Sequence, residues 1–295
     1  MQSKIRRSYL TEIPTHNWFT RAARAIFVEH RVPHVIDKHL NKALLSIGFK
    51  YKTIRIGDLR VKVRRCTADE AFVKNVIVDE EYFNHDYVPR KDDTIVDIGA
   101  NIGCFTLAAA SKTPNGKIIS IEPFPANIEL LKTNIKLNRL YNVHIVTAAI
   151  TDKVGQIELH IGHDTGMHSL KFDTGRGAIC VKGMRLEDIF TEYKIEWCNF
   201  LKIDCEGAEF DFLPTLPSHV WERIERIVME FSVPIPDWNF QNPTKEQIAL
   251  KQKYGEGLVD ILERNKFRIG AYVDCANFRA GYIYATNLKS QLVDS

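Results

Sequence analysis

Residues 97–105 constrain the fold of this chain more than any other stretch. A β-branched run at 94–98 leads into the letters DIGANIGCF, and a helix of small apolar residues at 107–110 follows directly. A strand that passes through a glycine turn into a helix is the start of a βαβ unit, whose strands pair in parallel. Ligands of such sheets bind at the carboxyl ends of the strands. The stretch therefore predicts a parallel α/β sheet with a ligand site on this loop.

Short β-branched runs alternate with helical segments from about residue 92 onward. The expected strands cover residues 94–98, 117–121, 143–148, 156–161, 199–203, 226–231, 267–273 and 281–286, and the helices include 124–138 and 245–265. This alternation is typical of a doubly wound, Rossmann-like α/β sheet, mostly parallel, whose last two strands form an antiparallel hairpin at one edge. We assign residues 88–295 to this catalytic domain.

Residues 1–87 follow a different pattern and are expected to form an extension that packs on the catalytic domain. Apolar residues recur at helical spacing over 15–48, with a break at Pro33. The stripe comprises Trp18, Ala22, Ala25, Ile26, Val35, Ile36, Leu40, Leu44 and Leu45. Residues 51–56 and 59–63 then alternate apolar with polar side chains around Gly57-Asp58, which predicts a β-hairpin.

The charge of the chain is unevenly divided. Within the formal net charge of +3, residues 1–75 carry 16 Lys and Arg against 6 Asp and Glu, whereas the rest carries 24 against 31. A basic segment could bind an anionic acceptor, nucleic acid or a membrane surface. We favour the alternative of a solvated face, because the basic residues are dispersed rather than clustered.

Three further features indicate a cytoplasmic protein. The N-terminus lacks the apolar core of a secretory signal, and no run of about 20 apolar residues could span a bilayer. The six cysteines are scattered without zinc-ligand spacing, so we expect free thiols rather than disulfides or a structural zinc site. The oligomeric state is open, and a homo-oligomer is compatible with the sequence.

The loop at residues 97–105 argues against a dinucleotide. That fingerprint needs G-x-G-x-x-G, but Asn101 and Cys104 occupy the second and third glycine positions. A ligand without phosphate, such as the methionine end of S-adenosylmethionine, needs fewer glycines and an acidic group for its ammonium, which Asp97 could supply. Gly99 and Gly103 would allow the tight turn and the close approach of backbone to ligand.

The second predicted strand ends in Glu122, where the ribose of such a cofactor would lie. An acidic side chain about 20 residues beyond the first loop can accept hydrogen bonds from both ribose hydroxyls. Pro123 and Phe124 could form an apolar wall for adenine, with Asn127 nearby as a hydrogen-bond partner. Alternatively, the loop at 97–105 could be only a glycine turn of the core, and Glu122 only a surface residue. We disfavour this interpretation because the loop and the acid follow consecutive strands.

Carboxylates gather where the methyl group of the cofactor would be transferred. Asp204, Glu206 and Glu209 surround Gly207 after one strand, and Glu230 ends the next. A carboxylate here could take the proton of an acceptor hydroxyl, or Asp204, Glu206 and Glu230 could bind a divalent metal that lowers the pKa of that hydroxyl. As an alternative, Glu206 and Glu209 could cap the following helix.

Two histidines, His163 and His168, lie in the polar segment 162–170 between these blocks. Histidine is the usual side chain for proton transfer near neutral pH. Most histidines in loops are merely solvated, but His168 remains a catalytic candidate beside Asp204 and Glu206.

At these residues the chain resembles the FkbM family of methyltransferases. The matching stretches are VDIGANIGCFTLAAA (96–110), GKIISIEPFPANIELLKTNIKLN (116–138), VHIVTAAITDKVGQIELHI (143–161), RLEDIF (185–190), LKIDCEGAEFDFL (201–213) and VMEFS (228–232). The resemblance implies S-adenosylmethionine as cofactor and O-methylation of sugar, glycan or natural-product hydroxyls. It also implies cofactor roles for Asp97, Gly99, Asn101, Gly103, Glu122 and Pro123. Phe105, which ends the loop 97–105, is a further candidate for contact with the cofactor.

The leading hypothesis is therefore an O-methyltransferase for a small-molecule or glycan acceptor. A methyltransferase for RNA or a protein side chain is the alternative, prompted by the basic N-terminal portion. Nucleic acid is an unlikely partner, because neither an N-P-P-Y type motif nor a module of stacked aromatic residues is present. A binding protein that has lost catalysis, and an oxidoreductase, are disfavoured by the intact acid cluster and by the missing dinucleotide glycines.

Overall fold

The computed structural model describes residues 33–235, 238, 241–275 and 278–289. The first half of the predicted N-terminal helical stripe, with Trp18, Ala22, Ala25 and Ile26, lies outside the described residues. Its second half is helix α2 (Pro33–Ser46).

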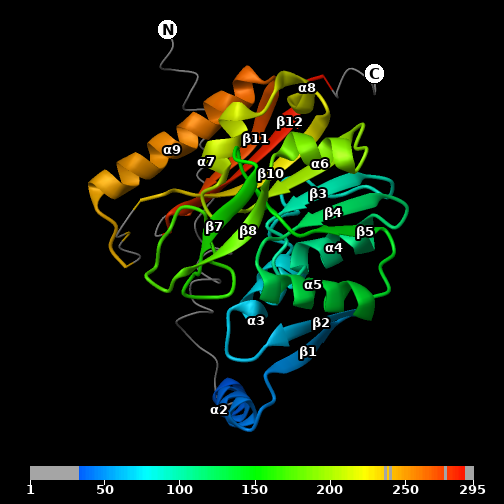
Figure 1. Ribbon diagram of the computed structural model, residues 1–295, viewed down its shortest axis with the longest axis vertical. Coiled ribbons are helices and arrows are strands. Elements are labelled where there is room, and N and C mark those ends of the chain that lie inside the picture. Colours follow the sequence, from blue (N-terminus) through cyan, green and yellow to red (C-terminus); the bar gives the residue numbers. More distant parts are fainter. Residues whose placement is uncertain (1–32, 236–237, 239–240, 276–277, 290–295) are drawn as a thin grey trace.

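The predicted hairpin follows α2 and is confirmed. Strands β1 (Tyr51–Ile56) and β2 (Leu59–Arg64) pair in antiparallel register, with Ile56 opposite Leu59 across the turn at Gly57 and Asp58. Figure 1 shows this hairpin beside α5 (Pro125–Leu137), with α2 as the outermost described element. Val61 and Val63 of β2 are fully buried, so the hairpin packs against the body of the molecule.

Seven strands form the central sheet in the order β11-β12-β10-β9-β3-β4-β5. They are β3 (Thr94–Ile98), β4 (Lys117–Ile121), β5 (Val143–Val146), β9 (Cys198–Ile203), β10 (Ile224–Ser232), β11 (Phe267–Asp274) and β12 (Ala280–Asn287). The first five along the chain are parallel and lie in the order 3-2-1-4-5, as in the Rossmann fold, while β12 is antiparallel to both neighbours. The predicted doubly wound sheet with an antiparallel hairpin at one edge is confirmed.

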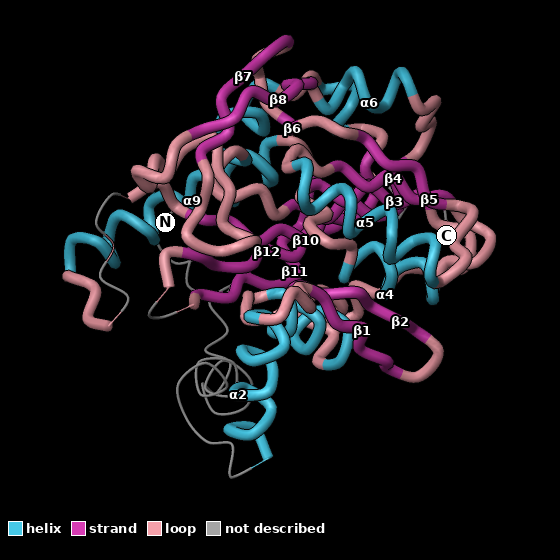
Figure 2. Tube along the Cα trace, turned by 60° about the horizontal axis from the view of Figure 1, so that its bottom comes forward, coloured by secondary structure: helices cyan, strands magenta, loops and turns pink. Residues whose placement is uncertain are grey.

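Helices cover both faces of this sheet. Figures 1 and 2 show α4 (Cys104–Lys112) and α5 on one side, and α6 (Leu186–Glu192) and α9 (Lys245–Arg264) on the other. Shorter helical pieces complete the chain: α3 (Asp69–Phe72), the π-helix η2 (Val73–Val78), α7 (Glu209–Phe212), the 3-10 helix η3 (Leu213–Thr215) and α8 (Ser218–Trp221). Thr244 caps α9, because its side chain accepts a hydrogen bond from the backbone of Gln247.

Alternate residues of the strands face two separate cores, as the two-residue period of a strand requires. Ile95, Phe200 and Val228 pack with α4, η2 and the hairpin, whereas Val96, Leu201 and Met229 pack with α6, α8 and α9. Asp97, Lys202 and Glu230 follow Ile95, Phe200 and Val228 by two residues, so they lie on the face that η2 covers. The pairing register of the strands therefore brings these three charged residues together beneath η2.

One predicted strand pairs with other strands than expected. The run at 156–161 was expected in the main sheet, but β7 (Gly155–His160) belongs to a three-stranded sheet with β6 (Ala149–Ile150) and β8 (Ala178–Met184). The alternation of apolar and polar residues along a strand shows which side chains share a face, but it does not show which strand lies beside it. The partner strand β8 was not predicted at all. The run predicted at 143–148 likewise ends at Val146, before the chain leaves the main sheet for β6.

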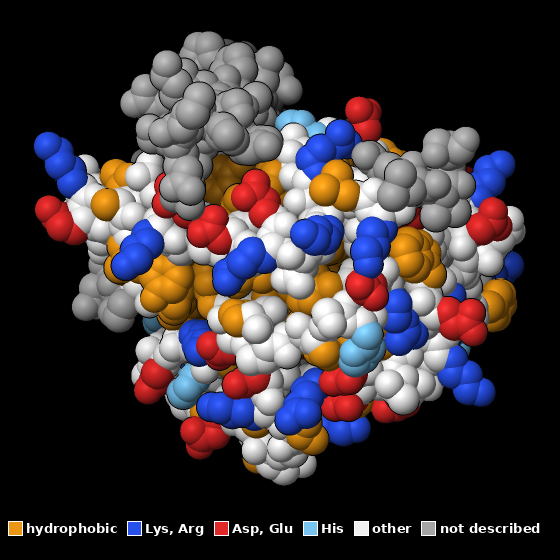
Figure 3. All heavy atoms as spheres, turned by 90° about the horizontal axis from the view of Figure 1, so that it is seen from above, with side chains coloured by type: hydrophobic (Ala, Val, Ile, Leu, Met, Phe, Trp, Pro, Cys, Tyr) orange, Lys and Arg blue, Asp and Glu red, His pale blue; other side chains and the backbone are white. Residues whose placement is uncertain are grey.

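The state of the cysteines and the distribution of charged side chains on the surface agree with the expectations from the sequence. All six cysteines are free, as predicted. In the part of the chain that the structure describes, no helix combines the length and the apolar character needed to cross a bilayer. On the face shown in Figure 3, acidic and basic side chains are interspersed and form no large field of one sign.

Candidate active site

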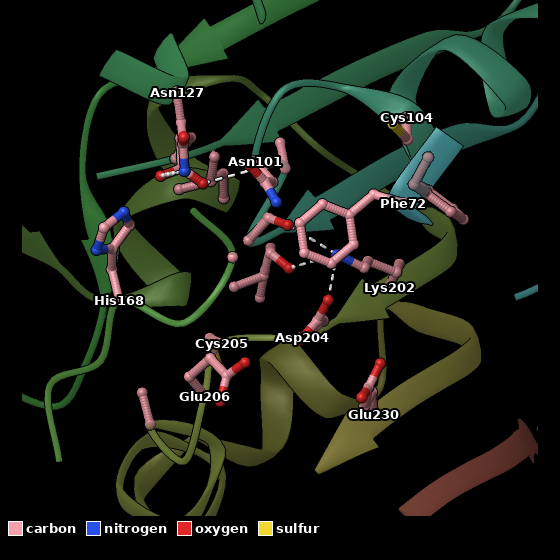
Figure 4. A pocket seen from close by; sticks show the side chains of 18 of the residues that line it. Phe72, Asn101, Cys104, Asn127, His168, Lys202, Asp204, Cys205, Glu206 and Glu230 are labelled. Carbon is pink, nitrogen blue, oxygen red and sulfur yellow. Dashed lines mark hydrogen bonds and ion pairs between the residues drawn. The ribbon is translucent and has the colours of Figure 1, made fainter. Parts of the chain in front are cut away.

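A cavity of about 320 Å³ opens at the carboxyl ends of β3, β4, β9 and β10. Its wall includes ten of the residues singled out in the sequence: Gly99, Asn101, Phe105, Glu122, Pro123, Asn127, His168, Asp204, Glu206 and Glu230. Asp97, Gly103 and Phe124 stand behind this wall, and His163 is exposed. Figure 4 shows Asn101, Asn127 and His168 around this cavity, together with the acidic residues Asp204, Glu206 and Glu230.

The loop after β3 has the conformation that its glycines allow. Gly99 and Gly103 have φ angles of 76° and 94°, in the left-handed region that favours glycine. A β-carbon at Gly103 would meet Leu131 at 2.6 Å, so this glycine lets α4 start directly against α5. Gly103 therefore shapes the loop from behind the wall.

Glu122 joins the loops after β3 and β4. Its carboxylate accepts hydrogen bonds from the backbone N–H of Asn101 at 2.8 Å and of Phe124 at 2.9 Å, and from the Asn127 amide at 3.3 Å. Burial raises the pKa of Glu122, and these donors partly offset the effect. The carboxylate is thus fixed at the end of β4 with one edge on the cavity.

The ring of His168 covers Phe124. The two rings stack with centroids 3.7 Å apart and an interplanar angle of 24°. His168 Nδ1 accepts a hydrogen bond from the Gly162 N–H, and burial lowers the pKa of the imidazole to about 4. The neutral ring must then carry its proton on Nε2, which is buried and meets no hydrogen-bond partner in the described part of the chain.

His168 lies with Asn127, across the cavity from Glu230 (Figure 4). A ring that is neutral, and whose one lone pair is already engaged by Gly162, is a poor proton acceptor. Its free Nε2–H suits it to donate a hydrogen bond to a bound ligand.

Lys202 is a buried cation that the sequence analysis missed. It pairs directly with Asp97 across β3 and β9, with 3.3 Å between Nζ and Oδ1, and it donates hydrogen bonds to the backbone oxygens of Ile98 and Gly99. Burial lowers the pKa of Lys202, but Asp97 and Asp204 outweigh it and the net shift is upward. A lysine between Leu201 and Ile203 in a buried strand was the available sequence signal.

Asp97 faces Lys202 and not the cavity. Its side chain is fully buried, and Thr106 donates a hydrogen bond to Asp97 Oδ2 at 2.7 Å. Burial raises the pKa of Asp97, and the Lys202 ammonium opposes this rise. The geometry therefore places Asp97 beneath the loop, where it anchors the lysine that holds the Gly99 backbone.

Two tyrosines bridge the acid cluster. Tyr82 Oη lies 2.9 Å from both Asp204 Oδ2 and Glu230 Oε2, and Tyr282 Oη lies 2.7 Å from Glu230 Oε2 and also bonds Glu81. The sequence pattern does not single out Tyr82 or Glu81. These two residues follow η2 and come to lie against the sheet only when the chain is folded.

The three carboxylates of this cluster differ in environment. Burial, with Asp204 and Glu81 nearby, raises the pKa of Glu230 well above its usual range, and burial likewise raises the pKa of Glu81. Asp204 is about 29% exposed and lies 3.5 Å from the Lys202 ammonium. Asp204 thus combines partial exposure at the cavity wall with a cation 3.5 Å away.

Glu206 and Glu209 occupy different positions after β9. Glu206 lies at the cavity wall, 3.6 Å from the Arg279 guanidinium, and burial followed by the Asp204 charge raises its pKa to about 8. Glu209 is fully buried and accepts hydrogen bonds from the backbone N–H of Gly207 and Ser232. Glu209 therefore holds the loop, and it does not cap α7, whose N-cap residue is Ala208 without a side-chain cap.

The candidate metal ligands are engaged with other partners. Tyr82 lies between Asp204 and Glu230, and Glu206 faces Arg279. Among the described residues, no three His, Cys, Asp or Glu side chains are grouped as a metal site would require.

The sheet order, the loop after β3 and the acid after β4 define a class I, Rossmann-like methyltransferase that depends on S-adenosylmethionine. The model of the FkbM methyltransferase domain matches residues 97–269, and the chain belongs to that family.

Two named methyltransferases and one solved structure are similar to this chain. The chain is 30% identical over 182 residues to Methyltransferase 1 of Beauveria bassiana (strain ARSEF 2860), covering 53% of this chain and 71% of that protein. It is 26% identical over 188 residues to the 31-O-demethyl-FK506 methyltransferase FkbM of Streptomyces tacrolimicus, covering 53% and 72%. The Methanococcus jannaschii fibrillarin pre-rRNA processing protein superposes with a TM-score of 0.46 at 14% identity, covering 81% and 83%.

The cavity fits the cofactor that this class uses. Its volume lies within the range of small-molecule sites. Two buried polar atoms on its wall, Asn101 Oδ1 and His168 Nε2, have no hydrogen-bond partner among the residues that the structure describes. A buried hydrogen-bond acceptor or donor without a partner lowers the stability of the fold unless a ligand or water molecule bonds to it. An adenosyl group carries both donors and acceptors, so it could bond to both atoms.

Proposed function

We propose that this chain transfers the methyl group of S-adenosylmethionine to a hydroxyl group of a carbohydrate, a glycan or a glycosylated or natural-product metabolite. The observation that carries the proposal is the position of Asp204, a partly exposed carboxylate at the cavity wall, 3.5 Å from a buried ammonium. An acceptor hydroxyl must lose a proton during transfer, and a carboxylate within hydrogen-bond reach of it can act as the base. The printed name of the Streptomyces relative, which describes an O-methylation, supports the same chemistry.

We propose that the adenosine of the cofactor lies at the side of the cavity formed by Glu122 and His168. Glu122 would accept the ribose hydroxyls, and His168 Nε2 would donate to the adenine edge. Asn101, Pro123 and Asn127 would complete this side of the wall, while Phe124 supports the His168 ring from behind.

The methionine end would then lie nearer the loop after β3, with Gly99 and Phe105. Asp97 would act here through Lys202, whose ammonium holds the Ile98 and Gly99 carbonyl groups in place. This role replaces direct contact between Asp97 and the ammonium of the cofactor.

When bound, S-adenosylmethionine supplies a methyl group activated by a positively charged sulfur. The residues of this chain have to orient the acceptor oxygen, exclude water and receive the hydroxyl proton. We assign the proton to Asp204, with Tyr82 and Lys202 fixing its carboxylate. Glu206, two residues beyond Asp204 on the same side of the cavity, is placed to bind another hydroxyl of the acceptor, and a divalent metal is not required by this scheme.

A transfer assay tests the proposal. The protein is incubated with S-adenosylmethionine labelled in the methyl group and with separate panels of glycans, hydroxylated metabolites, RNA and protein, at low and high salt. We expect label on a hydroxyl oxygen in the first two panels, with little dependence on ionic strength. Label on RNA, lost steeply as salt rises, would instead establish the alternative in which the basic N-terminal portion binds nucleic acid.

A further inference from the structure

The N-terminal hairpin reaches the cofactor side of the cavity through one arginine. Arg64, the last residue of β2, donates from Nη2 to Asn127 Oδ1 at 2.8 Å. Asn127 belongs to α5 and touches Glu122, the proposed ribose acceptor. Arg64 lies before the segment 97–269 that matches the family model, so this contact adds to the site from outside it.

Asp69 holds this arginine in place. Its carboxylate accepts Arg64 Nε at 2.8 Å and Nη2 at 3.0 Å, and also the Arg64 backbone N–H at 2.9 Å. The Asp69 side chain is fully buried, and that of Arg64 is only about 15% exposed. A bidentate pair in this environment is geometrically defined and poorly screened by solvent, unlike a surface ion pair.

The same carboxylate ties down the loop that carries His168. Thr165 donates its hydroxyl to Asp69 Oδ1 at 2.8 Å, and the neighbouring Asp164 accepts the backbone N–H of Ala68. Phe72 lies against this loop as well, because a β-carbon at Gly166 would stand 2.3 Å from its ring. Residues 64–72 therefore fasten the loop 162–168 to the body of the molecule.

The contact from Arg64 also decides which way the Asn127 amide points. Because Arg64 can only donate, it binds the amide oxygen, and the amide nitrogen is left to donate to Glu122 Oε1 and to the Thr165 carbonyl. A reversed amide would place its oxygen against the Glu122 carboxylate. Arg64 thus fixes the donor that orients Glu122.

We propose that Arg64 and Asp69 are positioning residues for the adenosine half of S-adenosylmethionine. They act on the cofactor through Asn127 and Glu122 on one side and through the His168 loop on the other. The inference rests on the proposed placement of adenosine between Glu122 and His168. It assigns to the N-terminal segment a part in cofactor binding, separate from any contact with the acceptor.

The first experiment compares Arg64→Lys with Arg55→Lys by calorimetry with S-adenosylhomocysteine and with adenosine. Lysine keeps the charge of Arg64 but cannot bind Asp69 and Asn127 together. Arg55 is an exposed arginine of the same hairpin whose side chain donates to the Gly57 carbonyl, so it is the matched control. We expect Arg64→Lys to weaken both ligands by the same factor, roughly 10-fold or more, and Arg55→Lys to bind normally.

A double-mutant cycle separates positioning from general support of the fold. If Arg64 acts through Asn127, then Arg64→Lys should weaken binding much less in an Asn127→Ala background than in the wild type. Equal losses in both backgrounds, or an unchanged dissociation constant for Arg64→Lys, would overturn the proposal. Thr165→Val, which keeps the side-chain shape and removes only the hydroxyl bonded to Asp69, gives a second route if Arg64→Lys does not fold.

Glu122→Ala distinguishes failure of this inference from failure of the proposed placement. If Glu122→Ala binds adenosine normally, adenosine does not lie at Glu122 and the placement itself is wrong. If Glu122→Ala weakens binding while Arg64→Lys and Thr165→Val do not, the placement holds and the positioning role is refuted.

Discussion

The backbone of Gly99 lies so close to Asp204 that a β-carbon at Gly99 would stand 1.7 Å from the Asp204 carbonyl oxygen. Gly99 begins the loop after β3, and Asp204 follows β9, the neighbouring strand. The loop that is expected to receive the cofactor and the loop that carries the proposed proton acceptor are therefore in direct backbone contact. The position of one fixes that of the other.

Gly99→Ala should damage both loops at once. The added carbon meets backbone rather than a flexible side chain, and alanine is strained at a φ of 76°. We expect a loss of stability of about 2 kcal/mol or more and a large loss of affinity for S-adenosylhomocysteine. Thermal melting and calorimetry measure the two effects. Gly257→Ala, where no atom lies within 4 Å of the new carbon, is the control and should be neutral or stabilising.

Asp204→Asn should separate catalysis from cofactor binding. The substitution keeps the shape of the side chain but removes its charge and hence its ability to take a proton. We expect normal folding, a nearly unchanged dissociation constant for S-adenosylhomocysteine and a turnover about 100-fold lower. Normal turnover would refute the assignment.

A chelator tests whether a metal takes part in the reaction of the wild-type protein. If the chelator abolishes activity and magnesium or manganese restores it, a metal takes part.

Glu122→Ala should weaken cofactor binding without abolishing the fold. The variant loses a charged acceptor for the ribose hydroxyls, and such hydrogen bonds are worth about 1–3 kcal/mol. Titration calorimetry with S-adenosylhomocysteine gives the difference directly. Glu122→Gln is the informative companion, because it keeps an acceptor oxygen and should recover part of the loss.

Lys202→Met should be strongly destabilising, although it fills similar space with an apolar side chain. It leaves the fully buried Asp97 without its cation, and loss of one partner of a buried ion pair costs about 3–5 kcal/mol. Chemical denaturation measures the loss. The double variant Lys202→Met/Asp97→Leu should regain stability without regaining activity, and no recovery would show that the pair is not the cause.

The pH dependence of stability should contain a contribution from Glu209. Burial raises the pKa of this carboxyl to about 7, and its hydrogen-bond donors offset only part of the rise. Between its usual pKa and about 7 the folded chain binds a proton that the unfolded chain has released, so stability falls as pH rises through this window.

The measurement compares melting temperatures from pH 5 to pH 8 without cofactor. Glu209→Gln cannot titrate, so its melting temperature should fall less steeply with pH than that of the wild type. Glu81 and Glu206, whose pKa values are also raised, remain in both proteins, and the difference in slope isolates Glu209. Identical slopes would contradict the assignment.

Much of the fold could be predicted because its signals are local. The strands at 94–98 and 117–121 coincide with β3 and β4, the hairpin turn lies at Gly57 and Asp58, and the predicted helix at 245–265 differs from α9 by one residue. β8 escaped prediction because the polar, glycine-containing stretch before it separates it from its partner β7. Strand pairing across such a gap leaves no periodic trace in the sequence.

The sequence alone determined which residues border the strand ends, because a residue's distance from the end of its strand is a property of the local chain. Gly99, Glu122, Asp204 and Glu230 were found in this way. Only the tertiary structure decided which way their neighbours point: Asp97 toward Lys202, His168 onto Phe124, Tyr82 between two carboxylates and Arg64 onto Asn127. These contacts join residues up to 148 positions apart in the chain. They depend on packing of whole elements, which no local spacing encodes.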